Sequence, residues 1–112
     1  MKKTYLLAID QGTTGTTAQV TTLDHNNQVE VVGQANFTFP LSFPKPEWVE
    51  QDLEEIWLSV EKAVKQAIST AAHYDHNFQP TKIAAIGITN QRETLCVFDR
   101  KSSLPLRKAI VW

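Results

Sequence analysis

Cysteine is nearly absent from this sequence, since Cys96 is the single one among 112 residues. An internal disulfide is therefore impossible, and the reducing cytoplasm is the expected location. We interpret Cys96 as a small core residue of a predicted strand. A reactive thiol is not indicated, because no cationic residue or helix start flanks it closely.

Long apolar runs are lacking as well. The stretch after Lys2 and Lys3 extends only from Tyr5 to Ile9 before Asp10 interrupts it, which is too short for the core of a signal peptide. No run approaches the roughly 20 apolar residues of a membrane helix. The sequence therefore predicts no membrane span.

The sequence also lacks an excess of charge of either sign. Its 11 Lys and Arg residues and 12 Asp and Glu residues give a net charge of −1. Surfaces for nucleic acid or anionic membranes need clustered positive charge, so neither partner is predicted. Hydrophobic residues make up 42% and charged residues 21%, as in ordinary globular proteins. This length allows one domain at most.

The first 39 residues are rich in strand-forming residues. The apolar run Tyr5–Ile9, ended by Asp10-Gln11-Gly12, is typical of a strand buried on both faces. Thr13–Leu23 and Val29–Phe39 are also β-prone, and the cluster Asp24–Asn27 between them favours a turn. Together they predict a three-strand antiparallel meander.

A connector containing Pro40, Pro44 and Pro46 separates the meander from the clearest periodic pattern in the chain. Apolar residues there recur at steps of three and four, which predicts an amphipathic helix of about five turns. We expect it to begin at Gln51 or Asp52 and to end within 77–80, with Trp57 packed on its apolar face. The periodic residues are Leu53, Ile56, Trp57, Val60, Ala63, Val64, Ala67, Ile68 and Ala71.

A second continuous apolar run, Ile83–Ile88, is typical of a central parallel strand. Thr94–Phe98 and Leu106–Trp112 are predicted strands on either side of a turn at Asp99–Ser103. The predicted order is β-β-β-α-β followed by a β pair, which is an α/β fold. A helix that joins two parallel strands usually brings them side by side. Asp10 and the segment Gln91-Arg92-Glu93 would then share the crevice at the carboxyl ends of the strands, where ligands of such sheets bind.

The turn from Asp10 to Thr16 is dense in small and hydroxyl-bearing residues. Its backbone N–H groups and threonine hydroxyls can bind a phosphate, and an aspartate at its mouth can hold Mg²⁺ through water. An ordinary hairpin turn with an Asp cap is the alternative. The turn is not a Walker A loop, because the Lys-Ser/Thr end is absent and no helix follows.

Arg92 and Glu93 adjoin each other after a predicted strand. A guanidinium and a carboxylate together offer donors and acceptors to the vicinal hydroxyls of a polyol, and Trp112 could pack against its carbons. A solvated charge pair and a core tryptophan are the alternatives. His73 and His76 are spaced to share a metal, but the lack of a third ligand nearby favours exposed histidines.

Four blocks of this sequence resemble the glycerol kinases, which are members of the FGGY family of carbohydrate kinases. They cover nearly the whole chain in the family's order, and related pentulose kinases generally lack the Asn-Gln-Arg-Glu-Thr of the third block. The blocks are Ile9-Asp10-Gln11-Gly12-Thr13-Thr14, then Pro44 to Asp52 with the following Glu55-Ile56-Trp57, then Ile83 to Thr94, and finally Ala109-Ile110-Val111-Trp112.

The resemblance implies an actin-like, ribonuclease-H-like ATPase domain that uses ATP and Mg²⁺ to phosphorylate glycerol to glycerol 3-phosphate. The implied nucleotide contacts are Asp10, Gly12, Thr13, Thr14 and Gly15, with Asp10 also near the metal, and the implied glycerol contacts are Arg92, Glu93 and Trp112. Two positions depart from the family pattern. Gly15 stands where serine is common, and Thr17 stands where an arginine usually approaches the nucleotide.

By the same resemblance, residues 1–112 are the N-terminal portion of the family's N-terminal domain. The family's catalytic aspartate and adenine pocket lie further along its sequence, so no catalytic residue is expected here and the chain alone should be inactive. The full-length protein is expected to be a cytoplasmic homo-oligomer. The alternatives are another FGGY kinase acting on a different polyol or a ketose, and a non-enzymatic actin-fold nucleotide-binding module.

Overall fold

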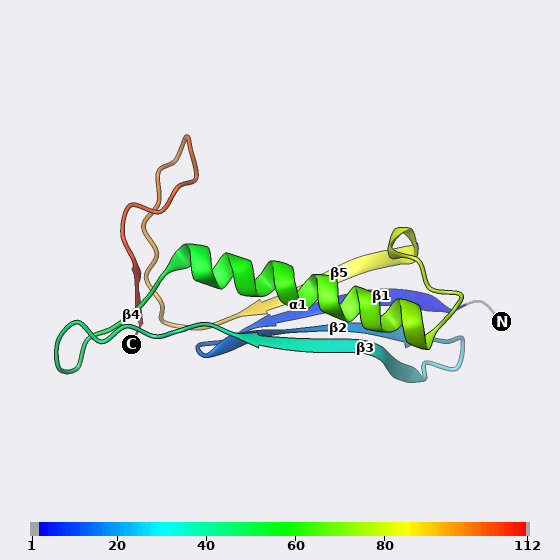
Figure 1. Ribbon diagram of the computed structural model, residues 1–112. Coiled ribbons are helices and arrows are strands. Elements are labelled where there is room, and N and C mark those ends of the chain that lie inside the picture. Colours follow the sequence, from blue (N-terminus) through cyan, green and yellow to red (C-terminus); the bar gives the residue numbers. More distant parts are fainter. Residues whose placement is uncertain (1–2, 112) are drawn as a thin grey trace.

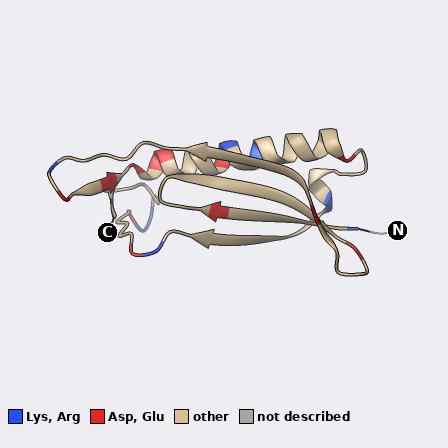
Figure 2. Ribbon diagram, turned by 90° about the horizontal axis from the view of Figure 1, so that it is seen from below, with Lys and Arg blue, Asp and Glu red and all other residues tan. Residues whose placement is uncertain are grey.

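Residues 3–111 are described by the computed structural model. They form a four-stranded sheet with one long helix across one of its faces, and a small two-stranded sheet near the start of that helix (Figure 1). The molecule is elongated, with extents of 55 × 31 × 23 Å. No helix in this described part is long and apolar enough to cross a membrane. Charged residues lie mainly on the helix and the loops, and the strands carry few of them (Figure 2).

The three N-terminal strands form the predicted antiparallel meander. Strand β1 (Thr4–Gln11) pairs with β2 (Gly15–Leu23), and β2 pairs with β3 (Val29–Thr38). The Asp24 side chain closes the β2–β3 turn by accepting hydrogen bonds from two backbone N–H groups at 2.8 and 2.9 Å. This local bonding is the reason that aspartate favours turns.

Strand β5 (Ile83–Asn90) follows a short 3₁₀ turn (Pro80–Lys82) and lies parallel to β1, which confirms that the helix joins two neighbouring parallel strands. Its predicted central, buried position is wrong. The sheet order is β3-β2-β1-β5, so β5 is at the edge, and Ile88 is 72% exposed. The run Tyr5–Ile9 is likewise buried on alternate residues only. The physical reason is that the one helix packs on β2 and β3, and no other element among residues 3–111 covers β5.

Helix α1 (Leu53–Tyr74) begins where the sequence predicts. Asp52 is its N-cap and accepts a hydrogen bond from the backbone N–H of Glu54 at 2.9 Å, which satisfies one of the free donors of the first turn. The residues of the helix that are buried against the sheet are all small: Ser59, Ala63, Ala67 and Ala71. This stripe of small side chains lets α1 approach the sheet closely.

The closest approach is at Gly33 on β3. A Cβ at this position would lie 2.2 Å from the carbonyl oxygen of Ala67 and 2.7 Å from the backbone nitrogen of Ala71. Neither atom can move without moving the helix, so only glycine fits. A buried hydrogen bond of 2.7 Å between the hydroxyls of Thr16 and Ser59 holds the other half of α1 to β2.

The far end of α1 is fastened to β1 through a tyrosine. The Tyr5 hydroxyl donates a hydrogen bond of 2.6 Å to Asp75, the C-cap residue, and the Tyr5 ring meets Phe78 edge-on at 5.2 Å. Burial and the Asp75 carboxylate raise the pKa of Tyr5 to about 12. The same hydrogen bond lowers the pKa of Asp75. The helix ends at Tyr74, slightly before the predicted 77–80.

Two residues predicted to be in the core lie at the surface. Trp57 is 62% exposed and Cys96 is also exposed. The buried stripe of α1 contains only small residues, so the large side chains of the periodic pattern fall outside it. Trp57 instead lines an open apolar groove of about 550 Å³ with Phe98 and Leu104.

The small sheet consists of β4 (Val49–Gln51) and β6 (Ala109–Val111), which are antiparallel. The sequence did not predict β4. The predicted strand at 94–98 is not regular: it makes only single bridges, Leu95 with Ile110 and Phe98 with Pro105. The small sheet places Gln51, the residue before the helix cap, next to the end of the main sheet.

Gly33→Ala should lower the free energy of unfolding by about 1–3 kcal/mol, because the added methyl group would push α1 off the sheet. Gly87→Ala on β5 is the matched control, since a Cβ there meets nothing within 4 Å, and its effect should stay within about 0.5 kcal/mol. Urea unfolding of the two variants measures the difference. Equal effects would show that the close approach at Gly33 does not constrain the packing.

The Tyr5–Asp75 bond should make stability depend on alkaline pH. Because folding raises the pKa of Tyr5 from 10.0 to about 12, its stabilising contribution is complete below pH 10.0 and disappears as the pH rises through 12. Tyr5→Phe removes this ionisation, so urea midpoints of the variant should fall less steeply between pH 10 and 12 than those of the original chain. Parallel midpoint curves would contradict the assignment.

Candidate functional site

The two clusters that the sequence places at strand ends lie side by side. In the parallel pairing of β1 with β5, Asp10 is opposite Thr89 and Gln11 is opposite Asn90. The turn after β1 and the segment after β5 therefore lie at the same end of the sheet, where both strands finish (Figure 1). Between them is an open pocket of about 350 Å³, here called the strand-end pocket. It is lined by Asp10, Gln11, Gly12, Thr13, Asn90, Gln91, Arg92 and Glu93.

The turn between β1 and β2 is held by a hydrogen bond of 2.8 Å from the backbone N–H of Gly12 to the carbonyl of Gly15. The backbone N–H groups of Thr13 and Thr14, at its tip, have no acceptor among residues 3–111. Free N–H groups at the tip of a tight turn are the donors that an anion such as phosphate requires. Thr13 lines the strand-end pocket, whereas Thr14 and Gly15 do not.

The glycines of this turn are not needed for a left-handed backbone. No glycine among the described residues has a positive φ, so the turn does not use the left-handed conformation that glycine permits. Gly15 begins β2, and a Cβ there would lie 2.7 Å from the carbonyl oxygen of Phe37. Gly15 is therefore required by the close pairing of β2 with β3, and that packing fixes the base of the turn.

Asp10 is exposed and borders two hollows. One is the strand-end pocket, and the other is a hollow of about 400 Å³ that Asp10 shares with Thr17 and Thr89. Thr17, which departs from the family pattern, accepts a hydrogen bond of 2.6 Å from the Asn36 side chain. A free carboxylate beside free N–H groups is an arrangement that suits a metal ion together with a phosphate.

The Arg92–Glu93 segment follows β5, and both residues are exposed. Neither takes part in the ion pairs found within the described chain, so their charged groups are free for a ligand. Glu93 has a φ of 58°, in the left-handed region that side chains other than glycine rarely adopt. Such backbone strain is found most often at functional sites. The sequence carries no sign of it.

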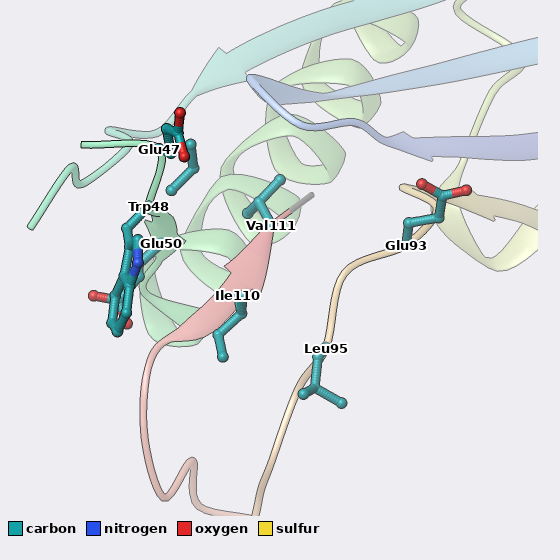
Figure 3. Close-up of a pocket in the computed structure, with 8 residues that line it drawn as sticks. Glu47, Trp48, Glu50, Glu93, Leu95, Ile110 and Val111 are labelled. Carbon is teal, nitrogen blue, oxygen red and sulfur yellow. The ribbon is translucent and has the colours of Figure 1, made fainter. Parts of the chain in front are cut away.

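Glu93 also borders a second pocket of about 420 Å³ (Figure 3). This open pocket is lined by residues of the paired strands β4 and β6 and of the Glu93–Leu95 segment. Glu47 at its rim has a φ of 67°, and Trp48 beside it stacks under the Lys45 ammonium at 4.7 Å. Glu93 thus lies between an open polar pocket and a more apolar one.

Three glutamines join the two halves of the site. The sequence placed Gln11 and Gln91 at the two strand ends, but it did not predict that they bond to each other and to Gln51. Gln91 donates hydrogen bonds to the side chains of Gln11 at 3.1 Å and Gln51 at 2.8 Å. Gln51 in turn donates to the carbonyl of Thr13 at 2.6 Å. We call Gln11, Gln51 and Gln91 the glutamine bridge. Nothing in the sequence marks Gln51 as part of the site, because a polar residue next to a helix cap is ordinarily exposed.

Two further sequence predictions concern Trp112 and the two histidines at the far end of α1. Trp112, predicted to pack against a polyol, lies outside the described residues. His73 and His76 are exposed, and the described part of the chain contains no group of three or more His, Cys, Asp or Glu residues that could hold a metal ion.

Comparison with known proteins gives a consistent result. Residues 5–112 match the N-terminal domain of the FGGY family of carbohydrate kinases. A glycerol kinase of Rhizobium rhizogenes is 52% identical over 108 residues, which are 96% of this chain and 20% of the relative. The crystal structure of Plasmodium falciparum glycerol kinase with ADP has a TM-score of 0.85 at 31% identity, over 98% of this chain and 20% of that one.

A xylulose kinase from Rhodospirillum rubrum has a TM-score of 0.80 at 24% identity, over 96% of this chain and 20% of that chain, and so shares the fold. These neighbours confirm the predicted actin-like α/β fold. The chain spans about a fifth of the length of the relatives that it matches.

Proposed function

This chain belongs to the FGGY family of carbohydrate kinases, and from that premise we propose that the protein transfers a phosphoryl group from ATP to a terminal hydroxyl of glycerol. Residues 1–112 would be the first part of the family's N-terminal domain. The choice of glycerol is supported by the 52% identity to a glycerol kinase. The glycerol 3-phosphate product follows from that choice.

One observation carries the proposal: groups that can bind a phosphate and groups that can bind a polyol line the same strand-end pocket. On one wall are the free N–H group of Thr13 and the carboxylate of Asp10, and on the other are Arg92 and Glu93. Phosphoryl transfer depends on placing the two reactants in contact and on stabilising the charge of the transferring group. A pocket with an anion-binding wall and a polyol-binding wall meets both needs.

Asp10 would be the protein ligand for Mg²⁺. Its carboxylate is exposed at the strand end, and the absence of a larger cluster of His, Cys, Asp or Glu among residues 3–111 fits an ion that keeps several waters and binds through one or two carboxylates plus phosphate oxygens. When bound, Mg²⁺ supplies neutralisation of the phosphate charge. Thr13 and Thr14 would bind the phosphate oxygens through their backbone N–H groups, with Gly12 and Gly15 shaping the turn.

Arg92 and Glu93 would bind glycerol. The guanidinium donates to hydroxyl oxygens and the carboxylate accepts from hydroxyl protons, so the pair can fix two neighbouring hydroxyls at once. Trp112 would add apolar contact with the carbons. Glu93 combines a left-handed backbone with a position at the border of the two pockets.

The remainder of the activity would come from beyond these residues. We propose that the catalytic aspartate and the adenine pocket lie in the four-fifths of the relatives' length that this chain does not span. The full-length protein would act as a homo-oligomer in the cytoplasm, where ATP is supplied. Residues 1–112 alone would then turn over no glycerol.

The second candidate function is that of another FGGY kinase, which phosphorylates a different polyol or a ketose. The structural likeness to a xylulose kinase is the observation in its favour. A panel of glycerol, other polyols and ketoses, assayed with the full-length protein, separates these activities. ATP binding without any turnover that a member of the panel stimulates would instead favour a non-enzymatic nucleotide-binding module.

Asp10→Ala in the full-length protein should lower kcat by at least about 100-fold while leaving the affinity for glycerol nearly unchanged, because the lost interaction acts on the transferring phosphoryl group. Glu55→Ala, an exposed carboxylate on α1, is the control and should keep full activity. Steady-state assays at saturating Mg-ATP measure kcat. If Asp10→Ala retains kcat, Asp10 is only a turn residue.

Arg92→Ala should raise KM for glycerol by roughly 10–150-fold, since a hydrogen bond to a charged group contributes about 1.5–3 kcal/mol. KM for ATP should change far less. Glu93→Gln, which keeps the shape of the side chain, should do less damage than Glu93→Ala, and Arg100→Ala in the exposed hairpin is the control. If Arg92→Ala instead weakened ATP binding and left glycerol binding unchanged, the assignment of the two walls to the two ligands would have to be reversed.

A further inference from the structure

Gln51 is a fully buried polar side chain at the junction of the small sheet and α1. It ends β4, immediately before the N-cap of the helix, and its exposed fraction is 0%. Both ends of its carboxamide are used, since the nitrogen donates to the carbonyl of Thr13 at 2.6 Å and the oxygen accepts from Gln91 at 2.8 Å. A carboxamide is suited to this position because it offers a donor and an acceptor on one rigid group.

Each partner of Gln51 belongs to a different half of the strand-end pocket. Thr13 stands at the tip of the turn between β1 and β2, and its carbonyl precedes the free N–H group of Thr14. Gln91 immediately precedes Arg92, and its own oxygen accepts a hydrogen bond from Thr94 at 3.0 Å on the far side of the Arg92–Glu93 segment. Gln51 therefore touches both walls without lining the pocket itself.

The bonds of the glutamine bridge close a loop around the turn. Gln91 also donates to Gln11, and the Gln11 side chain donates to the carbonyl of Gly12 at 2.8 Å. Every buried side-chain nitrogen and oxygen in the described residues has a partner, so this network is fully satisfied. A satisfied hydrogen-bond network rigidifies the groups that it joins, and this network joins the two walls of the pocket.

We propose that Gln51 is a positioning residue that couples the binding of the polyol to the binding of the nucleotide. The inference rests on the proposed function, because it takes the two walls to be the sites for those two ligands. A ligand that orders the Arg92–Glu93 segment would also fix Gln91, and through Gln51 it would fix Thr13, the residue at the tip of the turn that lines the wall proposed for the phosphate. Each ligand should then bind more tightly when the other is present, by the same factor.

The experiment measures that factor in the full-length protein by calorimetric titration with glycerol, with and without a non-hydrolysable ATP analogue and Mg²⁺. The original protein should bind glycerol at least about fivefold more tightly in the presence of the analogue. In Gln51→Met, which keeps the length and volume but loses both hydrogen bonds, the factor should fall to within about twofold of one. Gln66→Met, an exposed glutamine on α1, is the control and should keep the original factor.

Partial unfolding of a variant would raise the apparent factor, because each ligand shifts the protein toward its folded state, so poor folding cannot imitate the expected loss of coupling. If Gln51→Met does not fold, Gln91→Met removes the same link from the exposed side and should abolish the coupling equally. The Gln51 and Gln91 double variant should lose no more than either single one, as expected for one network. An unchanged factor in the folded variants, or no coupling in the original protein, would overturn the inference. A protein that phosphorylates no glycerol would overturn the proposed function instead.

Discussion

The contact of α1 with the sheet at Gly33 is the constraint on which the rest of the structure depends. Backbone atoms of the helix lie against backbone atoms of the strand there. The distance and orientation of the helix relative to the sheet are therefore set by atoms that have no rotamers to change. Together with the Thr16–Ser59 hydrogen bond, this contact fixes the start of the helix, and with it Gln51, one residue before the cap. The polar site at the strand ends is thus positioned by apolar packing along the helix.

Much of the fold could be predicted because its causes are local. The apolar run in β1, the aspartate turn after β2 and the periodic pattern of α1 each report the element that they form. The neighbouring arrangement of β1 and β5 followed from a general rule for helices that join parallel strands. That rule alone predicted that Asp10 and Arg92 would lie in the same pocket. Their roles there stay predictions.

The parts that could not be predicted arise from contacts between distant segments. Gln51 is buried because Thr13 and Gln91 surround it, 38 and 40 residues away in sequence. The left-handed backbone of Glu93 depends on the path of the chain between β5 and the small sheet. The exposure of Ile88 depends on what lies over β5. An apolar run indicates that a strand can be buried, but not which segment buries it.

The open edge of β5 also has a consequence for biosynthesis. In a protein as long as the matched relatives, about four-fifths of the chain is still to be translated when these residues have left the ribosome. At roughly 5–20 residues per second, that interval lasts tens of seconds. Throughout it, the nascent chain would present an unpaired strand edge next to exposed isoleucines, which is the kind of surface that hydrophobic-binding chaperones recognise and that invites misassembly with neighbouring nascent chains.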